Sequence, residues 1–202
     1  MESEMSNILT KFQDLNRVAL LMALVLTTPA YAEDNAVKSK ASEGFTREQV
    51  LEKADDFFGE TTVSLAKAIE KIFAVQGSPN AIIAGEEVSA ALGIGVRYGQ
   101  GELQRYNGDV KTIFWQGPSV GFDMGANVSK VFTLVYHLNE IQQLMQRIPG
   151  VDGSFYVVAG VGVNYQQSGD LILAPIRTGV GLRAGASVGY VHYSNKKSWI
   201  PF

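Results

Sequence analysis

Only two residues of this chain can supply an imidazole base, His137 and His192, and there is no cysteine. Nucleophilic catalysis needs a nucleophile, a base and an orienting group close together. His192 lies on an apolar strand face, where we expect a packed histidine, and His137 lies at a predicted strand-to-helix junction, where we expect capping or solvent contact. Glu86 and Glu87 are neighbours on a predicted strand, so they point to opposite sides and cannot form a carboxylate pair. We therefore predict no catalytic residues and no enzymatic activity.

Metal, cofactor and nucleic-acid sites are not predicted either. Two distant histidines without acidic neighbours do not have the spacing of a metal site. Gly93-x-Gly95 and Gly160-x-Gly162 lack the strand, loop and helix order of a phosphate-binding loop. The 17 basic residues are scattered and the net charge is -3, whereas nucleic-acid binding requires a dense basic stripe.

Lone charges interrupt strand faces that are otherwise almost bare of side chains. They are Arg97, Asp123 and Arg183, with Arg177 at the start of the last predicted strand. In one interpretation these charges keep a solvated face of the sheet soluble. In the other, Arg97 and Arg183 flank Asp123 across strands, which leaves one arginine to bind an anionic headgroup or a glycan.

The C-terminal segment mixes cations with aromatic residues. Lys196 and Lys197 precede Trp199 and Phe202, a combination that suits a membrane surface. It is equally typical of an arm that docks on its own domain. The possible surface ligand contacts are therefore Arg97, Asp123, Arg177, Arg183, Lys196, Lys197 and Trp199.

Helices with one apolar face are predicted at three places. Thr46-x-x-Gln49 is a capping box that begins the first helix, and Gly59 ends it. Ser64 caps a second helix, which stops at Gly77-Ser78-Pro79. A third helix is predicted over Leu138 to Ile148. Each of these helices must lay its apolar face on another element.

Strands with alternating or continuous apolar residues make up most of the remainder. Asn107-Gly108 is a strong hairpin signal, and Gly117-Pro118 predicts a turn. The predicted strands are Ala81–Ala84, Val88–Tyr98, Glu102–Tyr106, Val110–Trp115, Val120–Val128, Lys130–Tyr136, Ser154–Tyr165, Leu171–Ile176 and Thr178–Ser194.

Several of these strands have one apolar face and one glycine-rich face. In residues 92–99 the apolar side chains alternate with Gly93, Gly95, Arg97 and Gly99, and residues 120–126 and 178–192 show the same pattern. Glycine runs on one face indicate tight curvature. The predicted fold is therefore mainly β (α+β), a strongly coiled, barrel-like antiparallel sheet with two N-terminal amphipathic helices and one inserted helix.

Two orientations of such a sheet remain open. The apolar faces can point inward, in which case large residues such as Leu92, Phe122 and Tyr190 fill the interior and leave no ligand cavity. Alternatively, they can face lipid, as in a small outer-membrane β-barrel. We favour the first orientation, because amphipathic helices have no place in a minimal barrel wall.

The first 32 residues are predicted to be a cleavable secretory signal. Lys11 and Arg17 form its basic part, Val18–Leu26 its apolar core and Ala30-Tyr31-Ala32 its cleavage site. The apolar core is shorter than the roughly 20 residues that a membrane-spanning helix needs, so no transmembrane anchor is expected after cleavage. Residues 33–44 are predicted to be a flexible leader and residues 45–202 a single barrel-like domain.

Longer runs of the sequence resemble known families. The run FTREQVLEKADDFFGETTVSLAKAIEKIF, followed by GEEVSAALGIGVRYGQGEL, resembles the EipA family of alphaproteobacterial periplasmic proteins, over roughly Phe45 to Phe202. The segment GPSVGFDMGANVSKVFTLVYHLNEIQQLM is more loosely similar to the SYLF, or Ysc84-like, lipid-binding domain, as is the later AGVGVNYQ…ILAPIRTGVGLRAGASVGY.

The EipA resemblance implies a periplasmic barrel-like domain that supports envelope integrity without known catalysis. We expect it to act by binding a lipid, a glycan or another envelope protein. The SYLF resemblance implies the alternative of a lipid-binding or lipid-carrying domain. The first predicted helix lacks the basic face that attraction to anionic lipid favours.

Overall fold

The computed structural model describes residues 44–59, 62–121, 126–152, 154, 156–158, 161–178 and 189–198. The chain divides into two units, Met1–Ser39 and Lys40–Phe202, and every described residue belongs to the second unit. The predicted signal peptide and residues 33–43 of the predicted leader lie outside the described residues. So do Asp123, Arg183 and Trp199. Within the described part, no helix is long and apolar enough to cross a bilayer.

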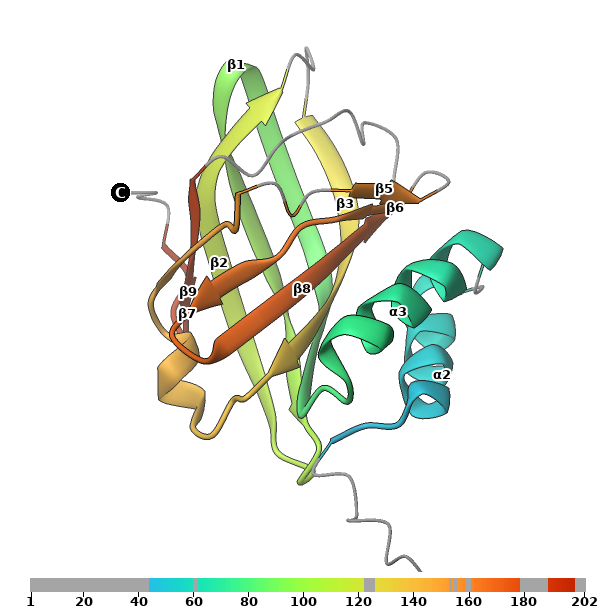
Figure 1. The fold of residues 1–202 in the computed structure, drawn as a ribbon. Helices are drawn as coiled ribbons and strands as arrows, with labels where there is room; N and C mark the ends of the chain where they lie inside the picture. Colours follow the sequence, from blue (N-terminus) through green and yellow to red (C-terminus); the bar gives the residue numbers. More distant parts are fainter. Residues whose placement is uncertain are drawn as a thin grey trace, which may run out of the picture. The chain divides into compact units, whose positions relative to one another are not determined.

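A curled antiparallel sheet forms the body of the second unit (Figure 1). Its described strands are ordered β4-β9-β2-β1-β3-β8-β6-β5, and β7 also pairs with β8. An isolated bridge between Gly150, just after β4, and Gln166, the first residue of β7, links one end of the path to the strand that pairs with β8. The predicted mainly β, barrel-like fold is therefore confirmed. The strands are β1 (Ala81–Arg105), β2 (Val110–Gly121), β3 (Ala126–Tyr136), β4 (Arg147–Pro149), β5 (Tyr156–Val158), β6 (Val161–Val163), β7 (Gln166–Ser168), β8 (Leu171–Thr178) and β9 (Tyr190–Ser194).

Strand β1 is long and folds back on itself, where the sequence predicted three separate strands. Residues 81–90 pair with β3, and residues 93–104 pair with β2. The two halves lie side by side, because the Tyr106 amide donates to the Asn80 carbonyl and a Cβ on Gly85 would overlap Gln100 and Gly101. Only glycine fits this close approach. The Asn107-Gly108 hairpin between β1 and β2 is confirmed, with Gly108 at a φ of 95°.

Two helices, α2 (Arg47–Phe58) and α3 (Val63–Gln76), pack against the outside of the sheet (Figure 1). The Thr46–Gln49 capping box and the Gly59 cap are present as predicted. The N-cap of α3 is Thr62 rather than the predicted Ser64. The helices and the outer face of the sheet share one apolar cluster: Phe45, Val50, Ala54, Leu65, Ala68, Ile69, Ile72, Ile82, Phe132, Leu134, Tyr136, Val161, Val163, Ala174 and Ile176.

The third predicted helix is much shorter than expected. Only Ile141–Leu144 is helical, as one 3₁₀ turn, and the chain continues into β4. The apolar positions were identified correctly, since Leu138, Leu144 and Ile148 are buried. Ile148 pairs with Val191 of β9, so pairing with the sheet ends the helix early. The predicted turn at Gly117-Pro118 was also wrong, because both residues lie within β2.

The glycine-bearing face of the long strands points into the barrel, opposite to the favoured prediction. Val88 and Val128, on the predicted inward face, are 45% and 62% exposed, whereas Glu87 and Arg97 on the glycine-bearing face are 5% and 6% exposed. In β9, Val191 and Tyr193 are buried rather than Tyr190 and His192. Leu92 and Phe122 lie outside the described side chains.

The barrel interior explains this orientation. A Cβ on Gly99 would overlap the indole of Trp115, which occupies the space that the missing side chain leaves. A Cβ on Gly117 would overlap the backbone of Tyr190 in the neighbouring strand. Glycine on the inner face therefore admits large side chains and close strands. The interior cluster is Ala81, Ile83, Leu103, Ile113, Trp115, Val131, Val135, Leu138, Leu144, Ile148, Leu171, Leu173, Val191 and Tyr193.

Candidate functional site

An open groove of about 660 Å³ runs over the outer face of β1 and β2. The rings of Tyr98 and Phe114 line it, and Lys197 and Ser198 border it from the segment after β9. Gly85, Gly99 and Gly101 also line it and present only backbone. A Cβ on Gly85 or Gly101 would overlap the other half of β1, and a Cβ on Gly99 would overlap the Trp115 indole. The full lining is Gly85, Glu86, Val88, Tyr98, Gly99, Gln100, Gly101, Phe114, Trp115, Gln116, Lys197 and Ser198.

The chemistry of this groove is mixed. Aromatic rings offer apolar faces for stacking, while the exposed Glu86 and Gln100 offer a carboxylate and an amide. The volume falls in the range of about 300–1,000 Å³ that is usual for ligand sites. The groove can therefore hold a ligand that is apolar on its faces and polar at its edges.

A buried ion cluster lies inside the barrel and includes Trp115, which also lines the groove. The Glu87 carboxylate accepts from Arg177 Nε at 3.3 Å and Arg177 Nη2 at 3.4 Å, and from Trp115 Nε1 at 2.8 Å. Arg97 Nη1 lies 3.8 Å from Glu87 Oε1, and Arg97 Nε donates to the Pro118 carbonyl at 2.9 Å. The cluster joins β1, β2 and β8, which supply the inner wall at this level.

The electrostatics of the two arginines differ. Although burial opposes the charge of Glu87, the two guanidiniums hold the pKa of its carboxyl below the usual value. Burial lowers the pKa of Arg97 more than Glu87 raises it, and Arg177 lowers it further. The pKa of Arg177 is raised, because the attraction and hydrogen bonds of Glu87 together exceed the effect of burial. Glu87 therefore neutralises Arg177 more fully than it neutralises Arg97.

Tyr193 completes the polar part of the interior. Its hydroxyl lies 3.1 Å from Oε1 of Gln166, and both residues are buried. Burial raises the pKa of the Tyr193 phenol, so the hydroxyl stays protonated and donates this hydrogen bond.

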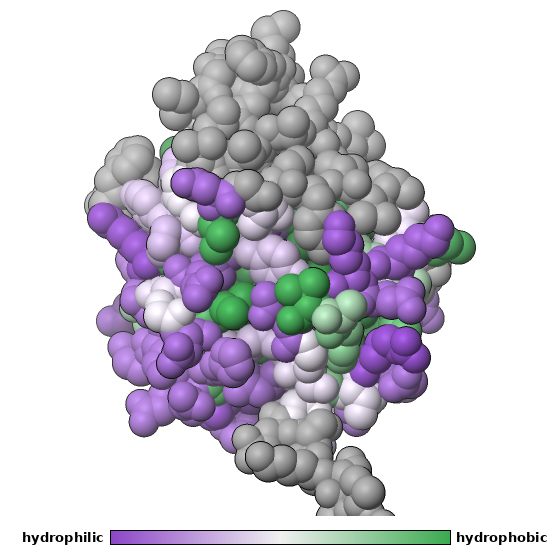
Figure 2. All heavy atoms as spheres, in the orientation of Figure 1, coloured by the Kyte–Doolittle hydropathy of each residue, from purple (hydrophilic) through white to green (hydrophobic). Residues whose placement is uncertain are grey.

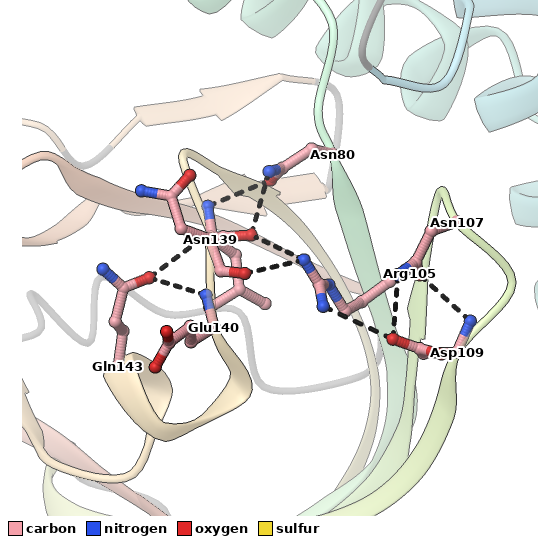
Figure 3. A network of polar contacts seen from close by, with 8 residues as sticks. Asn80, Arg105, Asn107, Asp109, Asn139, Glu140 and Gln143 are labelled. Carbon is pink, nitrogen blue, oxygen red and sulfur yellow. Dashed lines mark hydrogen bonds and ion pairs between the residues drawn. The ribbon is translucent and has the colours of Figure 1, made fainter.

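A second polar network links the β1–β2 hairpin to the segment after β3 (Figure 3). Arg105 Nη2 donates to the Asn139 carbonyl at 2.8 Å and to the Leu138 carbonyl at 3.3 Å. Asn80 clamps Leu138 by accepting from its amide and donating to its carbonyl, both at 3.1 Å. These polar groups satisfy one another within the fold, so we assign the network a structural role.

A hollow of about 630 Å³ adjoins this network, and His137 lines it with Asn80, Asn139 and Asp170. His137 is exposed directly after β3, as the expected solvent contact requires, and its Nδ1 lies 2.9 Å from the Asp170 carbonyl. Its φ of 59° is unusual for a residue other than glycine. Among the described residues, no group of three or more potential ligands is placed to hold a metal ion.

The structure brings together only some of the predicted contact residues. Arg97 and Arg177 are not on a solvated face, because both are largely buried against Glu87. Lys196 and Lys197 are exposed, and Lys197 borders the groove. The predicted arrangement around Asp123 and Arg183 cannot be placed, since both lie outside the described residues.

Sequence reasoning missed two features of these sites. The opposite orientation of Glu86 and Glu87 on their strand was predicted correctly. The pairing of Glu87 with Arg177 was missed, because the two residues are 90 positions apart in the sequence. The groove was missed because the fold-back of β1 brings Gly85 beside Gln100 and Gly101, residues that the sequence analysis placed on separate strands or between them. The signal that could have indicated it is the spacing of Gly85, Gly99 and Gly101 on one face.

Comparison with known proteins shows a family and a similar solved structure. A family model described as EipA, envelope integrity protein A, matches residues 43–202. The chain is also similar to a crystal structure of a beta-barrel-like, uncharacterized protein from Brucella abortus. The two are 45% identical with a TM-score of 0.72, over 80% of this chain and 100% of that one. No curated protein matches the chain.

Proposed function

The chain belongs to the envelope integrity protein A family, and we propose that it acts in the periplasm as a non-enzymatic binding protein for an envelope glycan. The coarser role, support of cell-envelope integrity, follows from the family itself. The groove over β1 and β2 carries the finer proposal, because its aromatic, amide and carboxylate lining is suited to sugar rings.

The lining of the groove suits a chain of sugars. Gly85, Gly99 and Gly101 add only backbone to its lining, next to the rings of Tyr98 and Phe114. Tyr98 and Phe114 can stack on the apolar faces of the rings. Gln100 and Glu86, both exposed, can bond to hydroxyl groups at the edges of those rings.

A lipid ligand is less well supported by the same surface. Acyl chains gain about 0.8 kcal/mol for each CH₂ group removed from water, and an open groove leaves much of a chain exposed. The apolar interior cluster is filled by its own side chains. Figure 2 shows that hydrophobic residues on the face it displays form small patches among hydrophilic ones, within the described part of the chain.

The test is co-sedimentation of the purified protein with peptidoglycan sacculi, with soluble envelope polysaccharide as competitor. We expect the wild type to bind and Phe114→Ala to bind at least tenfold more weakly. Gln100→Ala, which alters an exposed side chain, gives a second groove variant with little risk to folding. Val110→Ala is the matched control, because Val110 is exposed on the same strand outside the groove.

Two outcomes would overturn the proposal. Binding to vesicles of phosphatidylethanolamine and phosphatidylglycerol, without binding to sacculi or polysaccharide, would support the lipid-binding alternative. Equal binding by the groove variants and the control would place the contact elsewhere. The proposed location has its own test, since release of the protein by osmotic shock supports the periplasm and recovery only in membranes contradicts it.

A further inference from the structure

We infer that the hollow beside His137 binds the primary ammonium group of a small ligand, an amino sugar or an amino acid. The hollow lies where three parts of the fold meet: the loop from α3 to β1, the segment after β3 and the end of β7 with its turn into β8. It shares no lining residue with the groove, so the inference does not rest on the proposed function.

His137 has a strained backbone conformation that Asn80 fixes from both sides. Its φ of 59° lies in the left-handed region, which residues other than glycine rarely adopt. The Asn80 amide donates to the Val135 carbonyl, and the Asn80 side chain bonds to both the amide and the carbonyl of Leu138 (Figure 3). Strain of this kind persists only where the surrounding structure holds it, and it concentrates at functional sites. His137 is therefore held firmly beside the hollow.

The hydrogen bond of the His137 imidazole determines which of its ring nitrogens can accept. Nδ1 lies 2.9 Å from the carbonyl oxygen of Asp170, and a carbonyl oxygen can only accept, so Nδ1 carries the proton. In a neutral imidazole the other nitrogen, Nε2, then carries the lone pair. The ring is exposed and lines the hollow. His137 therefore brings a hydrogen-bond acceptor to this hollow.

Two further acceptors line the same hollow. Asp170 bonds to His137 through its backbone carbonyl, and its exposed side chain adds a carboxylate to the lining. The side-chain nitrogen of Gln167 donates to the Gly169 carbonyl at 3.0 Å, so its amide oxygen is the group that can accept from a ligand. The lining thus combines a carboxylate, an imidazole nitrogen and an amide oxygen.

This set of acceptors matches a primary ammonium group. An ammonium has three N–H donors and no acceptor, and its bond to an ionised carboxylate is stronger than a bond between neutral groups. An anion would be repelled by Asp170. The volume of about 630 Å³ is sufficient for the rest of an amino sugar or an amino acid, to which Ser78 and Asn139 can bond from the same lining.

The experiment follows the ring Cε1–H signal of His137 by NMR while the purified protein is titrated with n-butylammonium chloride. The titration is done at constant ionic strength and pH 8, where primary amines are charged. We expect a saturable shift of this signal. The chain has two histidines, so His192, which does not line the hollow, is the internal reference and should not shift.

Two matched probes separate the N–H donors from the charge. The n-butyltrimethylammonium ion keeps the positive charge without any N–H group, and n-butanol offers one O–H donor without the charge. Both are expected to bind at least tenfold more weakly than n-butylammonium. Glucosamine and glycinamide then distinguish an amino sugar from an amino acid. N-acetylglucosamine is the control for glucosamine, because acetylation removes the ammonium group.

Variants test the assigned residues. Asp170→Asn keeps the backbone carbonyl that holds His137, and it is expected to weaken n-butylammonium binding at least tenfold. His137→Asn is expected to weaken it as well, with the backbone amide signal of Ile172 as the readout, because asparagine tolerates the left-handed conformation. Asp152→Asn alters an exposed carboxylate outside the hollow and should bind as the wild type does. Phe114→Ala, which tests the groove, should also keep this response.

The proposal is overturned if n-butylammonium causes no saturable shift of the His137 signal. It is also overturned if n-butyltrimethylammonium binds equally well, which would indicate an unspecific attraction of cations, or if Asp170→Asn responds like the wild type. A response of His137 to zinc chloride without any response to the amines would indicate a metal site instead.

Discussion

Arg177 holds the carboxylate of Glu87 through two hydrogen bonds, 3.3 Å from its Nε and 3.4 Å from its Nη2, inside the barrel. The contact joins β8 to β1, strands that do not pair with each other in the sheet. Trp115 of β2 donates to the same carboxylate. One acidic side chain therefore links three parts of the barrel wall.

Removal of this carboxylate is expected to be strongly destabilising. In Glu87→Gln, two buried guanidiniums would face each other without a counter-charge, and breaking a buried pair costs about 3–5 kcal/mol. Urea unfolding measures the free energy of unfolding. The neighbouring Glu86→Gln, on the exposed side of the same strand, is the control and is expected to change stability by less than about 0.5 kcal/mol. Equal effects of the two substitutions would contradict the assigned role of Glu87.

The same carboxylate predicts a loss of stability in acid. Its pKa is lowered in the folded state, so the folded protein binds this proton less readily than the unfolded chain does. The stabilisation is fully present above the ordinary glutamate pKa of about 4.3 and is lost as the pH falls through the lowered value. Unfolding free energies measured between neutral pH and pH 2 should fall less steeply in Glu87→Gln. Parallel curves for the two proteins would exclude this linkage.

Tyr193 predicts the opposite dependence at high pH. Its pKa is raised in the folded state, so the unfolded chain loses this proton first. The stabilisation is present below the ordinary tyrosine pKa of about 10 and is lost as the pH rises further. Between pH 9.5 and 11, Tyr193→Phe should reduce the slope by up to about 1.4 kcal/mol per pH unit. Tyr106→Phe, at an exposed tyrosine, should leave the slope unchanged, and an identical slope in Tyr193→Phe would rule the assignment out.

Gly99 is expected to tolerate no side chain. A Cβ there would overlap the Trp115 indole, and overpacking of this kind costs about 1–3 kcal/mol. Gly99→Ala should lower the free energy of unfolding and shift the fluorescence of Trp115, in a Trp199→Phe background that leaves one tryptophan. Gln100→Ala, at the adjacent exposed position, is the control. Unchanged fluorescence in Gly99→Ala would show that the indole does not depend on this glycine.

Local features of the fold could be predicted from the sequence, because short segments determine them. The capping box at Thr46, the cap at Gly59 and the Asn107-Gly108 hairpin each depend on a few neighbouring residues. The predicted apolar positions near Leu144 were also right, although pairing of β4 with β9 replaced most of the predicted helix.

The orientation of the sheet and the buried cluster could not be predicted in the same way. The alternation of apolar residues and glycine shows that the two faces of a strand differ. It does not show which face points into the barrel, because α2 and α3 also bury apolar residues on the outer face. The choice between the faces depends on how Trp115 fills the space over Gly99. The pairing of Glu87 with Arg177 depends on the curl of the whole sheet, which no local pattern contains.

The most direct test of the account uses cells in which the native protein is replaced by Phe114→Ala at equal abundance, with Val110→Ala as the matched control. If the groove binds an envelope glycan, cells carrying Phe114→Ala should be as sensitive to detergent as cells lacking the protein, and the Val110→Ala cells should be as resistant as the wild type. Full detergent resistance in the Phe114→Ala cells would contradict the central claim.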